Sequence, residues 1–345
     1  MHIPDGSIVW YQAAIYWLIA IIFIARSIKW ARSDLNEDMI PLFGVLAAGM
    51  FVLQTINIAA NLLIPVPVLG GVSWHVVGAA LAAIIFASPW AAVLLLTLVL
   101  AVQSLFGDGG ITVMGANILN MGVIGGFFGY YGFIALSKLS VRRSIALFAG
   151  AWISMILPAI ALVFELWLSG TFPLKEGVLY MSIFQGAAGI GEGLITVIVF
   201  NAIIKVRPDI IAEEGYKKVS TAKVAAAGIV AFAGLAIAAP FLASGDPDGL
   251  EHTTSILVKS SVENTITLLF SNYAIPGMGK TGEIAAILIG FAAILIIWFG
   301  AAKIIRTADK SAQSHASGGR VHVCPAGHTC ARSREPAGFR LDKRK

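Results

Sequence analysis

The fold of this chain is decided by residues 144–168, which read S-I-A-L-F-A-G-A-W-I-S-M-I-L-P-A-I-A-L-V-F-E-L-W-L. Glu165 is the only charged residue in this stretch. A helix that crosses the hydrocarbon layer of a membrane needs about 20 mainly apolar residues, and this stretch meets that length. It therefore predicts a transmembrane helix.

The whole chain has the composition of a membrane protein. Of its 345 residues, 58% are hydrophobic and 12% are charged, and its mean hydropathy is +0.84. Soluble domains carry about 25% charged residues, which help to cover their surface. The apolar runs are continuous, whereas the strands of a membrane β-barrel alternate. We therefore predict an all-α integral membrane protein.

Nine apolar runs are candidate transmembrane spans. They are residues 8–25, 39–57, 75–87, 89–106, 118–137, 144–168, 178–204, 222–243 and 281–304. The third and fourth runs are short and are joined only by Ser88-Pro89-Trp90, which predicts a tight hairpin. We expect the first seven runs to form one bundle and the last two to follow as a C-terminal pair.

The basic residues predict the orientation of these spans, because cytoplasmic loops retain Lys and Arg. Basic residues follow the first, fifth and seventh spans and are frequent in the C-terminal tail. The alternate loops contain only Lys175, Lys259 and Lys280. We therefore predict a cell-membrane protein with its N-terminus outside and its C-terminus in the cytoplasm. The net charge of +5 follows from this bias and does not indicate nucleic-acid binding.

The N-terminal sequence M-H-I-P-D-G suggests a metal site on the outer side. The Met1 amine, the His2 amide and the His2 imidazole could bind one ion in small chelate rings. Late first-row ions such as Ni²⁺ and Cu²⁺ favour such planar nitrogen coordination. His75 opens the third predicted span on the same side and could be the fourth ligand. The alternatives are a frayed terminal His2 and an interfacial His75 beside Trp74.

Three features of the first 205 residues resemble the CbiM/NikM family, the substrate-binding membrane components of energy-coupling-factor transporters for cobalt or nickel. They are M-H-I-P-D-G, the histidine that opens the third span, and G-D-G-G-I-T-V-M-G-A-N-I-L-N-M-G at 107–122. The resemblance implies that Met1, His2 and His75 bind the ion from outside. It implies Ni²⁺ or Co²⁺ as transported substrate and no cofactor. It also implies a coupling membrane subunit like CbiQ or NikQ, and a cytoplasmic ATPase like CbiO or NikO.

The glycine-rich stretch 107–122 offers three polar side chains near the predicted site. A metal-bound imidazole usually donates its second N–H to a carboxylate or carbonyl, and Asp108 is the candidate acceptor. Asn117 and Asn120 could hold the loop. The alternative is a glycine-rich packing loop capped by these side chains. Glu192, in the seventh span, could line an ion path, but a hydrogen-bonded packing role is favoured.

A second unit is predicted at residues 222–304, after a basic linker at 206–221 that separates it from residues 1–205. Its motifs D-P-D-G-L-E at 246–251 and N-Y-A-I-P-G at 272–277 resemble the CbiN-type accessory component. This fused arrangement is similar to nickel members and favours Ni²⁺ over Co²⁺. The resemblance implies a helper that loads or gates the metal site. The acidic residues could hold a metal transiently or form a solvated turn, and the turn is favoured.

The C-terminal residues 305–345 predict a basic, disordered cytoplasmic tail. A possible second metal site lies in this tail, at His322, Cys324, His328 and Cys330, although its spacing matches no standard zinc finger. G-M-G-K-T at 277–281 is not a phosphate-binding loop, because Ala274 stands where that motif requires glycine. We find no other such motif, so the ATPase is expected to be a separate partner.

These features predict a transport component of an ATP-driven metal importer and not an enzyme. A membrane-embedded metal-dependent enzyme would have to use His75, Asp108 and Glu192, which are predicted at different depths. The sequence has no H-E-x-x-H motif to support that alternative. A metal-sensing receptor would need a signalling domain, and the tail is too short and polar to form one.

Overall fold

The computed structural model describes residues 1–208, 220–258 and 270–317, with side chains up to residue 304. The chain divides into two compact units, Met1–Lys303 and Ile304–Lys345. The predicted tail site at His322, Cys324, His328 and Cys330 lies outside the described residues.

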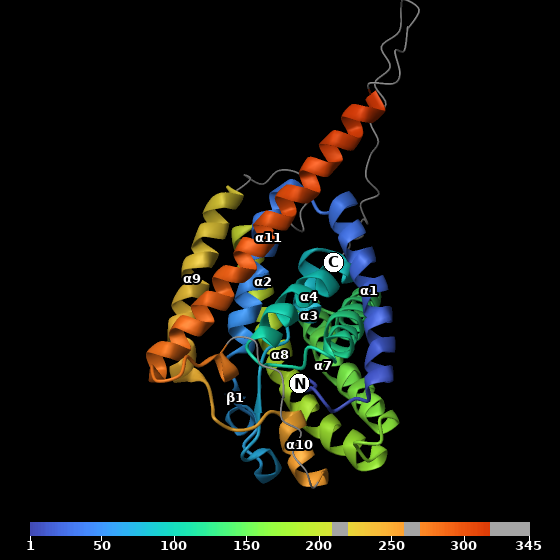
Figure 1. Cartoon of the computed structure of the whole chain (residues 1–345), viewed down its shortest axis with the longest axis vertical. Coiled ribbons are helices and arrows are strands. Elements are labelled where there is room, and N and C mark those ends of the chain that lie inside the picture. Colours follow the sequence, from blue (N-terminus) through green and yellow to red (C-terminus); the bar gives the residue numbers. More distant parts are fainter. Residues whose placement is uncertain (209–219, 259–269, 318–345) are drawn as a thin grey trace, which may run out of the picture. The chain divides into compact units, whose positions relative to one another are not determined.

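The described part of the chain is almost entirely helical (Figure 1). Its α-helices are α1 (Trp10–Ser33), α2 (Ile40–Gln54), α3 (Ala79–Ile85), α4 (Pro89–Leu105), α5 (Met114–Asn117), α6 (Gly126–Lys138), α7 (Arg143–Leu168), α8 (Leu174–Val206), α9 (Thr221–Leu242), α10 (Gly249–Leu257) and α11 (Gly279–Ser317). A π-helix, η4 (Ile118–Gly125), joins α5 to α6. Short 3-10 turns are η1 (Glu37–Met39), η2 (Ala60–Leu62), η3 (Pro67–Leu69) and η6 (Ser271–Tyr273). The all-α prediction is confirmed.

One small antiparallel hairpin interrupts the helices between α2 and α3. Its strands are β1 (Ile58–Ala59) and β2 (Ser73–Trp74), paired in the register Ile58 with Trp74 and Ala59 with Ser73. The backbone N–H of Ser73 also donates to the carbonyl of Pro247, at 2.8 Å. The strand that precedes His75 therefore contacts the segment before α10.

The structure differs from the nine predicted spans at two of them, residues 75–87 and 89–106. Seven helices in the described ranges are long and apolar enough to cross a membrane, namely Trp10–Ser33, Glu37–Gln54, Met114–Lys138, Arg143–Leu168, Leu174–Val206, Thr221–Leu242 and Gly279–Ile304. The third predicted span, 75–87, contains only the seven-residue helix α3, and α4 has 17 residues. Every residue of α3 is buried. An apolar run this short is more typical of a helix covered by protein than of a lipid-facing one.

The turn between α3 and α4 matches the predicted tight hairpin. Ala87 has a φ of 50°, in the left-handed region, and Pro89 begins α4. A hairpin returns the chain to the side from which it entered. Replacing two predicted spans with this hairpin therefore leaves the predicted sides of the two termini unchanged.

Helices α7 and α8 pack closely against each other. Small residues of α8 allow α7 to approach, because a Cβ on Gly189 would lie 2.8 Å from the Trp152 ring and one on Gly193 would lie 2.5 Å from the Phe148 ring. The Glu192 carboxylate, between these glycines, accepts hydrogen bonds from the backbone N–H groups of Val77 (2.9 Å) and Gly78 (2.7 Å). This geometry fits the packing role that was favoured for Glu192.

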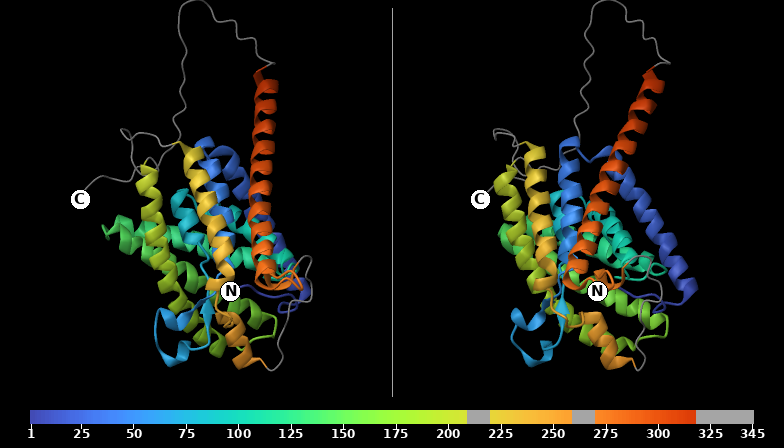
Figure 2. Two further views of the ribbon diagram at one scale, coloured as in Figure 1. Left: turned by 90° about the vertical axis from the view of Figure 1, so that its left-hand side faces the viewer. Right: turned by 60° about the vertical axis from the view of Figure 1, so that its left-hand side comes forward.

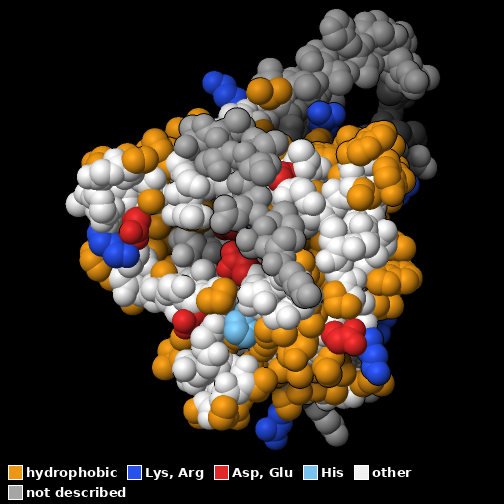
Figure 3. Space-filling view, turned by 60° about the horizontal axis from the view of Figure 1, so that its bottom comes forward, with side chains coloured by type: hydrophobic (Ala, Val, Ile, Leu, Met, Phe, Trp, Pro, Cys, Tyr) orange, Lys and Arg blue, Asp and Glu red, His pale blue; other side chains and the backbone are white. Residues whose placement is uncertain are grey.

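Helices α9 and α11 pack against α2. Gly49 of α2 faces Phe232 of α9, and a Cβ on Gly44 would lie 2.5 Å from Trp298 of α11. The Trp298 indole also donates to the Ile40 carbonyl, at 2.9 Å. Figure 2 shows α9 and α11 beside α2 in both of its views. Large apolar side chains cover much of the exposed surface, as Figure 3 shows for one face.

Candidate metal centre

The first five residues form a buried segment without helix or strand. Met1, His2 and Ile3 are at most 9% exposed. The Asp5 carboxylate accepts hydrogen bonds from the backbone N–H groups of Ile111 (3.2 Å) and Thr112 (2.8 Å), and also from the Thr112 hydroxyl. Two side-chain oxygens thus bind the backbone of the glycine-rich loop.

The same loop binds the backbone of Ile3. The Asn117 carboxamide accepts from the Ile3 N–H at 2.8 Å and donates to the Ile3 carbonyl at 3.1 Å. The N–H of Gly110 donates to that carbonyl at 2.9 Å. A Cβ on Gly110 would lie only 2.4 Å from the Asp5 backbone nitrogen, so this close approach requires glycine. The loop therefore binds the N-terminal segment through hydrogen bonds and close packing.

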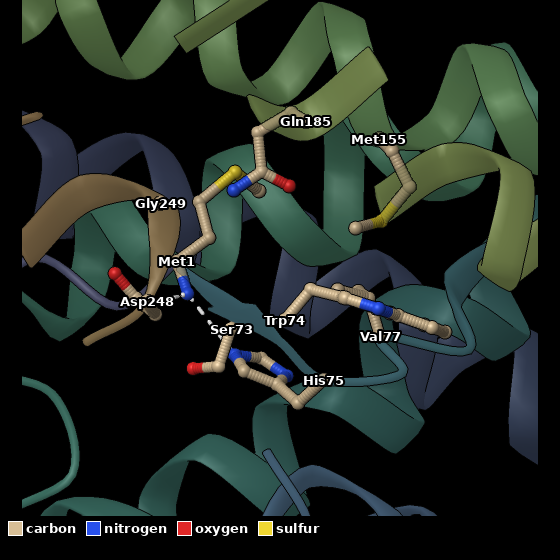
Figure 4. Close-up of a pocket in the computed structure, with 9 residues that line it drawn as sticks. All are labelled: Met1, Ser73, Trp74, His75, Val77, Met155, Gln185, Asp248 and Gly249. Atoms are coloured by element: carbon tan, nitrogen blue, oxygen red, sulfur yellow. Dashed lines mark hydrogen bonds and ion pairs between the residues drawn. The ribbon is translucent and has the colours of Figure 1, made fainter. Parts of the chain in front are cut away.

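The terminal amine lies between a histidine and a carboxylate (Figure 4). The Met1 nitrogen is 3.0 Å from Nε2 of His75 and 2.5 Å from Oδ2 of Asp248. Burial lowers the pKa of His75, and the positive charge of the amine lowers it further, to about 3. Burial raises the pKa of the Asp248 carboxyl, but the adjacent ammonium lowers it more, to about 2. Near neutral pH, His75 is therefore a neutral nitrogen donor and Asp248 is an anion.

The His2 imidazole lies beside these groups. Its ring stacks on the His75 ring, with centroids 5.1 Å apart and planes inclined by 9°. Nδ1 of His2 is 2.9 Å from Oδ1 of Asp108, while Nε2 is buried and has no hydrogen-bond partner among the described residues. Burial raises the pKa of the Asp108 carboxyl, but the His2 imidazole lowers it more, so the pKa lies well below its usual range.

His75 is held by contacts on both sides of it in the sequence. On one side, β2 pairs with β1 and binds Pro247. On the other, Glu192 binds the two backbone N–H groups described above, and the Gln54 amide donates to the Val77 carbonyl at 3.0 Å. His75 therefore lies in a segment outside helix and strand that these contacts fix, and not at the start of a helix, which corrects the prediction for this position.

A small cavity of about 10 Å³ adjoins the amine. Met1, Trp74, His75, Met155, Gln185 and Asp248 are among the residues that line it (Figure 4). The indole N–H of Trp74 and the side-chain amide oxygen of Gln185 are buried and have no hydrogen-bond partner within the described residues.

The structure brings together five of the six membrane-domain residues that were predicted for the site, namely Met1, His2, His75, Asp108 and Asn117. Asn120 lies elsewhere, since its amide donates to the Glu165 carboxylate at 2.7 Å. This contact attaches the stretch 107–122, which Asn120 was expected to hold, to Glu165 and does not place Asn120 beside the N-terminal segment. Asn120 is in the π-helix η4, whose geometry directs this side chain toward α7.

Two contacts from the C-terminal part of the chain were not predicted. Asp248 meets the terminal amine, although a solvated turn was favoured for it. Its carboxylate also caps α10, accepting from the N–H groups of Leu250 (2.7 Å) and Glu251 (2.9 Å). Tyr273 donates its hydroxyl to Oδ2 of Asp108, at 2.7 Å. Both residues belong to the quoted motifs, but nothing in a motif indicates which distant residue it contacts.

Within the described ranges, no group of three or more His, Cys, Asp or Glu side chains could hold a metal ion. A centre at this place therefore needs the terminal and backbone nitrogens of Met1 and His2 beside the histidine side chains.

The fold and this cluster define a multi-pass membrane protein whose buried N-terminal nitrogens converge on a histidine. Residues 2–210 match the family model CbiM, described as the cobalt uptake substrate-specific transmembrane region, and residues 222–307 match the PDGLE domain. The chain belongs to the CbiM family, as its motifs predicted. It is a transport protein and not an enzyme.

Individual relatives agree with this assignment. The chain is 34% identical to a putative fused nickel transport protein NikMN of Archaeoglobus fulgidus, over 89% of this chain and 100% of the relative. It is 30% identical to the cobalt transport protein CbiM of Acetohalobium arabaticum, over 59% of this chain and 82% of the relative. A crystal structure of a truncated transition metal transporter is similar with a TM-score of 0.52 and 28% identity, covering 59% of this chain and 99% of that one.

Proposed function

We propose that this chain is the substrate-specific membrane component of an ATP-driven importer that binds Ni²⁺, in preference to Co²⁺, from outside the cell. The observation that carries the proposal is the 3.0 Å distance between the Met1 nitrogen and Nε2 of His75, in a buried segment that also presents the His2 amide and imidazole. The similarity to fused nickel transport proteins supports nickel as the substrate.

The ligands are the Met1 amine, the His2 amide, the His2 imidazole and the His75 imidazole. Four nitrogens in a plane suit Ni²⁺ better than Co²⁺, and the ion acidifies the His2 amide so that its nitrogen can bind. His75 is neutral at physiological pH, as a metal-binding imidazole must be. The ion is the transported substrate.

Binding rearranges the His2 ring. Small chelate rings use Nδ1 of this histidine, the nitrogen that contacts Asp108 in the structure. A half-turn about the Cβ–Cγ bond frees Nδ1 for the ion and puts Cδ2 in its place, so a further shift of the side chain is needed to bring Nε2 to Asp108. Asp108 then accepts a hydrogen bond from the imidazole nitrogen that does not bind the ion, as carboxylates commonly do at metal sites.

The PDGLE domain, which contains Asp248, helps to load this site. Asp248 holds the Met1 amine beside His75 and leaves it when the ion takes the amine nitrogen. A second membrane subunit couples transport to ATP hydrolysis. The cytoplasmic ATPase is a separate chain, since this sequence has no phosphate-binding loop.

A binding experiment on the purified full chain in detergent tests the site. We expect stoichiometric Ni²⁺ binding, weaker Co²⁺ binding and no turnover, measured by calorimetry and elemental analysis. The His2→Ala variant should lose this affinity. If His2→Ala binds Ni²⁺ as tightly as the wild type, the N-terminal site is wrong.

Accessibility labelling tests the orientation. In a chain whose two native cysteines are replaced, we expect the exposed Ser271→Cys variant to react with an impermeant thiol reagent added to intact cells. The Ser33→Cys variant, exposed at the end of α1, should react only after permeabilisation. The reverse pattern would put the metal centre on the cytoplasmic side and contradict import through it.

A further inference from the structure

A chain of hydrogen bonds connects the C-terminal part of the protein to the His2 imidazole. The Tyr273 hydroxyl donates to Oδ2 of Asp108 at 2.7 Å, and Oδ1 of the same carboxylate is 2.9 Å from Nδ1 of His2. The two oxygens of Asp108 therefore face different partners. Tyr273 follows Asp108 by 165 positions, so the contact exists only because the folded chain brings them together.

The tyrosine ring is fixed by aromatic neighbours. It stacks on Phe106, with centroids 5.2 Å apart and planes inclined by 25°, and meets Phe51 edge-on at 5.7 Å. The N–H of the preceding residue, Asn272, donates to the Phe106 carbonyl at 3.1 Å. Phe106 directly precedes the glycine-rich loop, so Tyr273 is packed against the start of the segment that holds the N-terminus.

The backbone at this position is strained. Asn272 and Tyr273 have φ values of 51° and 55°, and both lie in the left-handed region that costs little only for glycine. Asparagine tolerates this region, but a bulky residue such as tyrosine is an outlier there. Such conformations persist when surrounding contacts impose them, and they gather at functional sites. Here the imposed conformation directs the tyrosine toward Phe106 and Asp108.

We propose that Tyr273 is a positioning residue of the metal centre, which acts through Asp108 on the His2 imidazole. The inference rests on the proposed function and adds to it that the PDGLE domain orients a ligand as well as contacting the amine. With the hydroxyl bound to Oδ2, the carboxylate cannot turn about its Cβ–Cγ bond, and Oδ1 keeps facing the imidazole. The imidazole is then held in one plane before and after the ion binds.

A purely structural role would be different. Tyr273 could serve only to attach its loop to Phe106 and Phe51 through the ring. The Tyr273→Phe variant separates the two roles, because it keeps the ring and removes the hydroxyl. Tyr130→Phe is the matched control, since the Tyr130 hydroxyl donates to the Ala87 carbonyl at 3.0 Å and contacts none of the proposed ligands.

The experiment compares Ni²⁺ dissociation constants of full-length chains in detergent, measured by competition with a chelator. Losing a hydrogen-bond partner of a metal-bound histidine weakens metal binding by about 10–100-fold. Tyr273 is one hydrogen bond further from the His2 imidazole than Asp108 is, so we expect about a tenfold loss for Tyr273→Phe. Tyr130→Phe should stay within about twofold of the wild type. At saturating Ni²⁺ the visible absorption of Tyr273→Phe should equal that of the wild type, because the ligands are unchanged.

A double-mutant cycle with Asp108→Ala gives the decisive comparison. If Tyr273 acts through Asp108, adding Tyr273→Phe to Asp108→Ala should cause no further loss beyond about twofold. Wild-type affinity in Tyr273→Phe overturns the proposal. An equal loss in both backgrounds also overturns it, since the tyrosine would then act through the loop.

Failure of the proposed function gives a separate result. The His2→Ala variant is measured in the same series. If the wild type binds Ni²⁺ no more tightly than His2→Ala, the N-terminal site and the role of Tyr273 both fail. If the wild type binds tightly through His2 and Tyr273→Phe is unchanged, only the role of Tyr273 fails.

Discussion

The N-terminal segment and the helix that follows it differ in burial in a way that their composition does not suggest. The segment has a histidine and an aspartate, yet Met1, His2 and Asp5 are buried. Helix α1 is rich in Ile and aromatic residues, yet Trp10 is 81% exposed and Leu18 is 65% exposed. The polar segment is covered by protein, and the apolar helix faces outward.

Backbone hydrogen bonding explains this difference. A helix satisfies its own N–H and C=O groups and can therefore face lipid, whereas irregular backbone at membrane depth must be buried among protein partners. The segment finds these partners in Asn117, in the N–H of Gly110 and in the loop backbone that binds Asp5. Ile3 is held by its backbone, so its neighbours Met1 and His2 are fixed against His75 and Asp108.

Lengthening the segment should have the largest effect. Insertion of two glutamines between Met1 and His2 separates the amine from the His2 amide, so that the two no longer form one chelate ring, and displaces the amine from His75. Glutamine is bulky enough to keep Met1 from being removed. We expect a loss of Ni²⁺ affinity of about 100-fold or more, measured by chelator competition. The Leu18→Ala variant, on the exposed face of α1, is the control and should remain within about twofold of wild type. Unchanged affinity after the insertion would refute the terminal amine as a ligand.

Replacing His75 should have the next largest effect. His75→Ala leaves three nitrogens and a position open to water, so we expect about a 100-fold loss of affinity, at the upper end for such sites. The absorption of a planar Ni²⁺ site, in the yellow-orange range, should also disappear. His252→Ala, on α10, should change neither property. If His75→Ala keeps the planar spectrum, a different residue supplies the fourth ligand.

A methyl group added to the loop at Gly110 should reduce the Ni²⁺ affinity less. In Gly110→Ala the new Cβ would lie 2.4 Å from the Asp5 nitrogen, so the segment has to move away from the loop. We expect about a tenfold loss of Ni²⁺ affinity, comparable to the loss of a contact beside the ligands. Gly186→Ala on α8 is the matched control, because the nearest atom to its Cβ would be 3.9 Å away. Equal affinities in the two variants would mean that the close fit of the segment does not matter.

The segment after His75 should respond mainly in stability. Glu192→Gln replaces one accepting oxygen with an amide group, so a buried N–H of Val77 or Gly78 loses its acceptor, at a cost of about 1–3 kcal/mol in the free energy of unfolding. Glu283 pairs with Lys280 at the surface. The Glu283→Gln variant should therefore lower the free energy of unfolding by less than about 1 kcal/mol. Denaturant unfolding in detergent measures both. Equal stability of the two variants would contradict a packing role for Glu192.

Removing the C-terminal tail should have the smallest effect. Deletion of residues 312–345 removes His322, Cys324, His328 and Cys330 and should leave Ni²⁺ affinity within about twofold of wild type, because all proposed ligands lie elsewhere. Loss of high-affinity binding in this deletion, with normal binding in His75→Ala, would transfer the metal site to the tail.

Much of the fold could be predicted because apolar runs report directly on exclusion from water. The run at 144–168 predicted α7, and the runs at 178–204 and 222–243 predicted α8 and α9. The same signal failed at 75–87, since an apolar run does not state whether lipid or protein covers it. In the structure, protein covers α3, and the residues from His75 to Gly78 lie outside helix and strand.

The candidate site could be predicted in part. Met1, His2 and His75 were singled out because nitrogen donors are scarce in so apolar a chain, and the structure places them together. Their role as ligands stays a prediction. Asn117 and Asn120 were indistinguishable in the sequence, being three residues apart, and the helical geometry directs one to Ile3 and the other to Glu165.

The sequence by itself determined that this is a helical membrane protein of the CbiM family, with its rare histidines as the candidate metal donors. Composition and local motifs suffice for this, because the length of an apolar run and the chemistry of a donor do not depend on distant residues. Only the tertiary structure decided that Asp248 meets the Met1 amine and that Tyr273 meets Asp108. These contacts join residues 247 and 165 positions apart, and they depend on how α9, α10 and α11 pack against the rest of the chain.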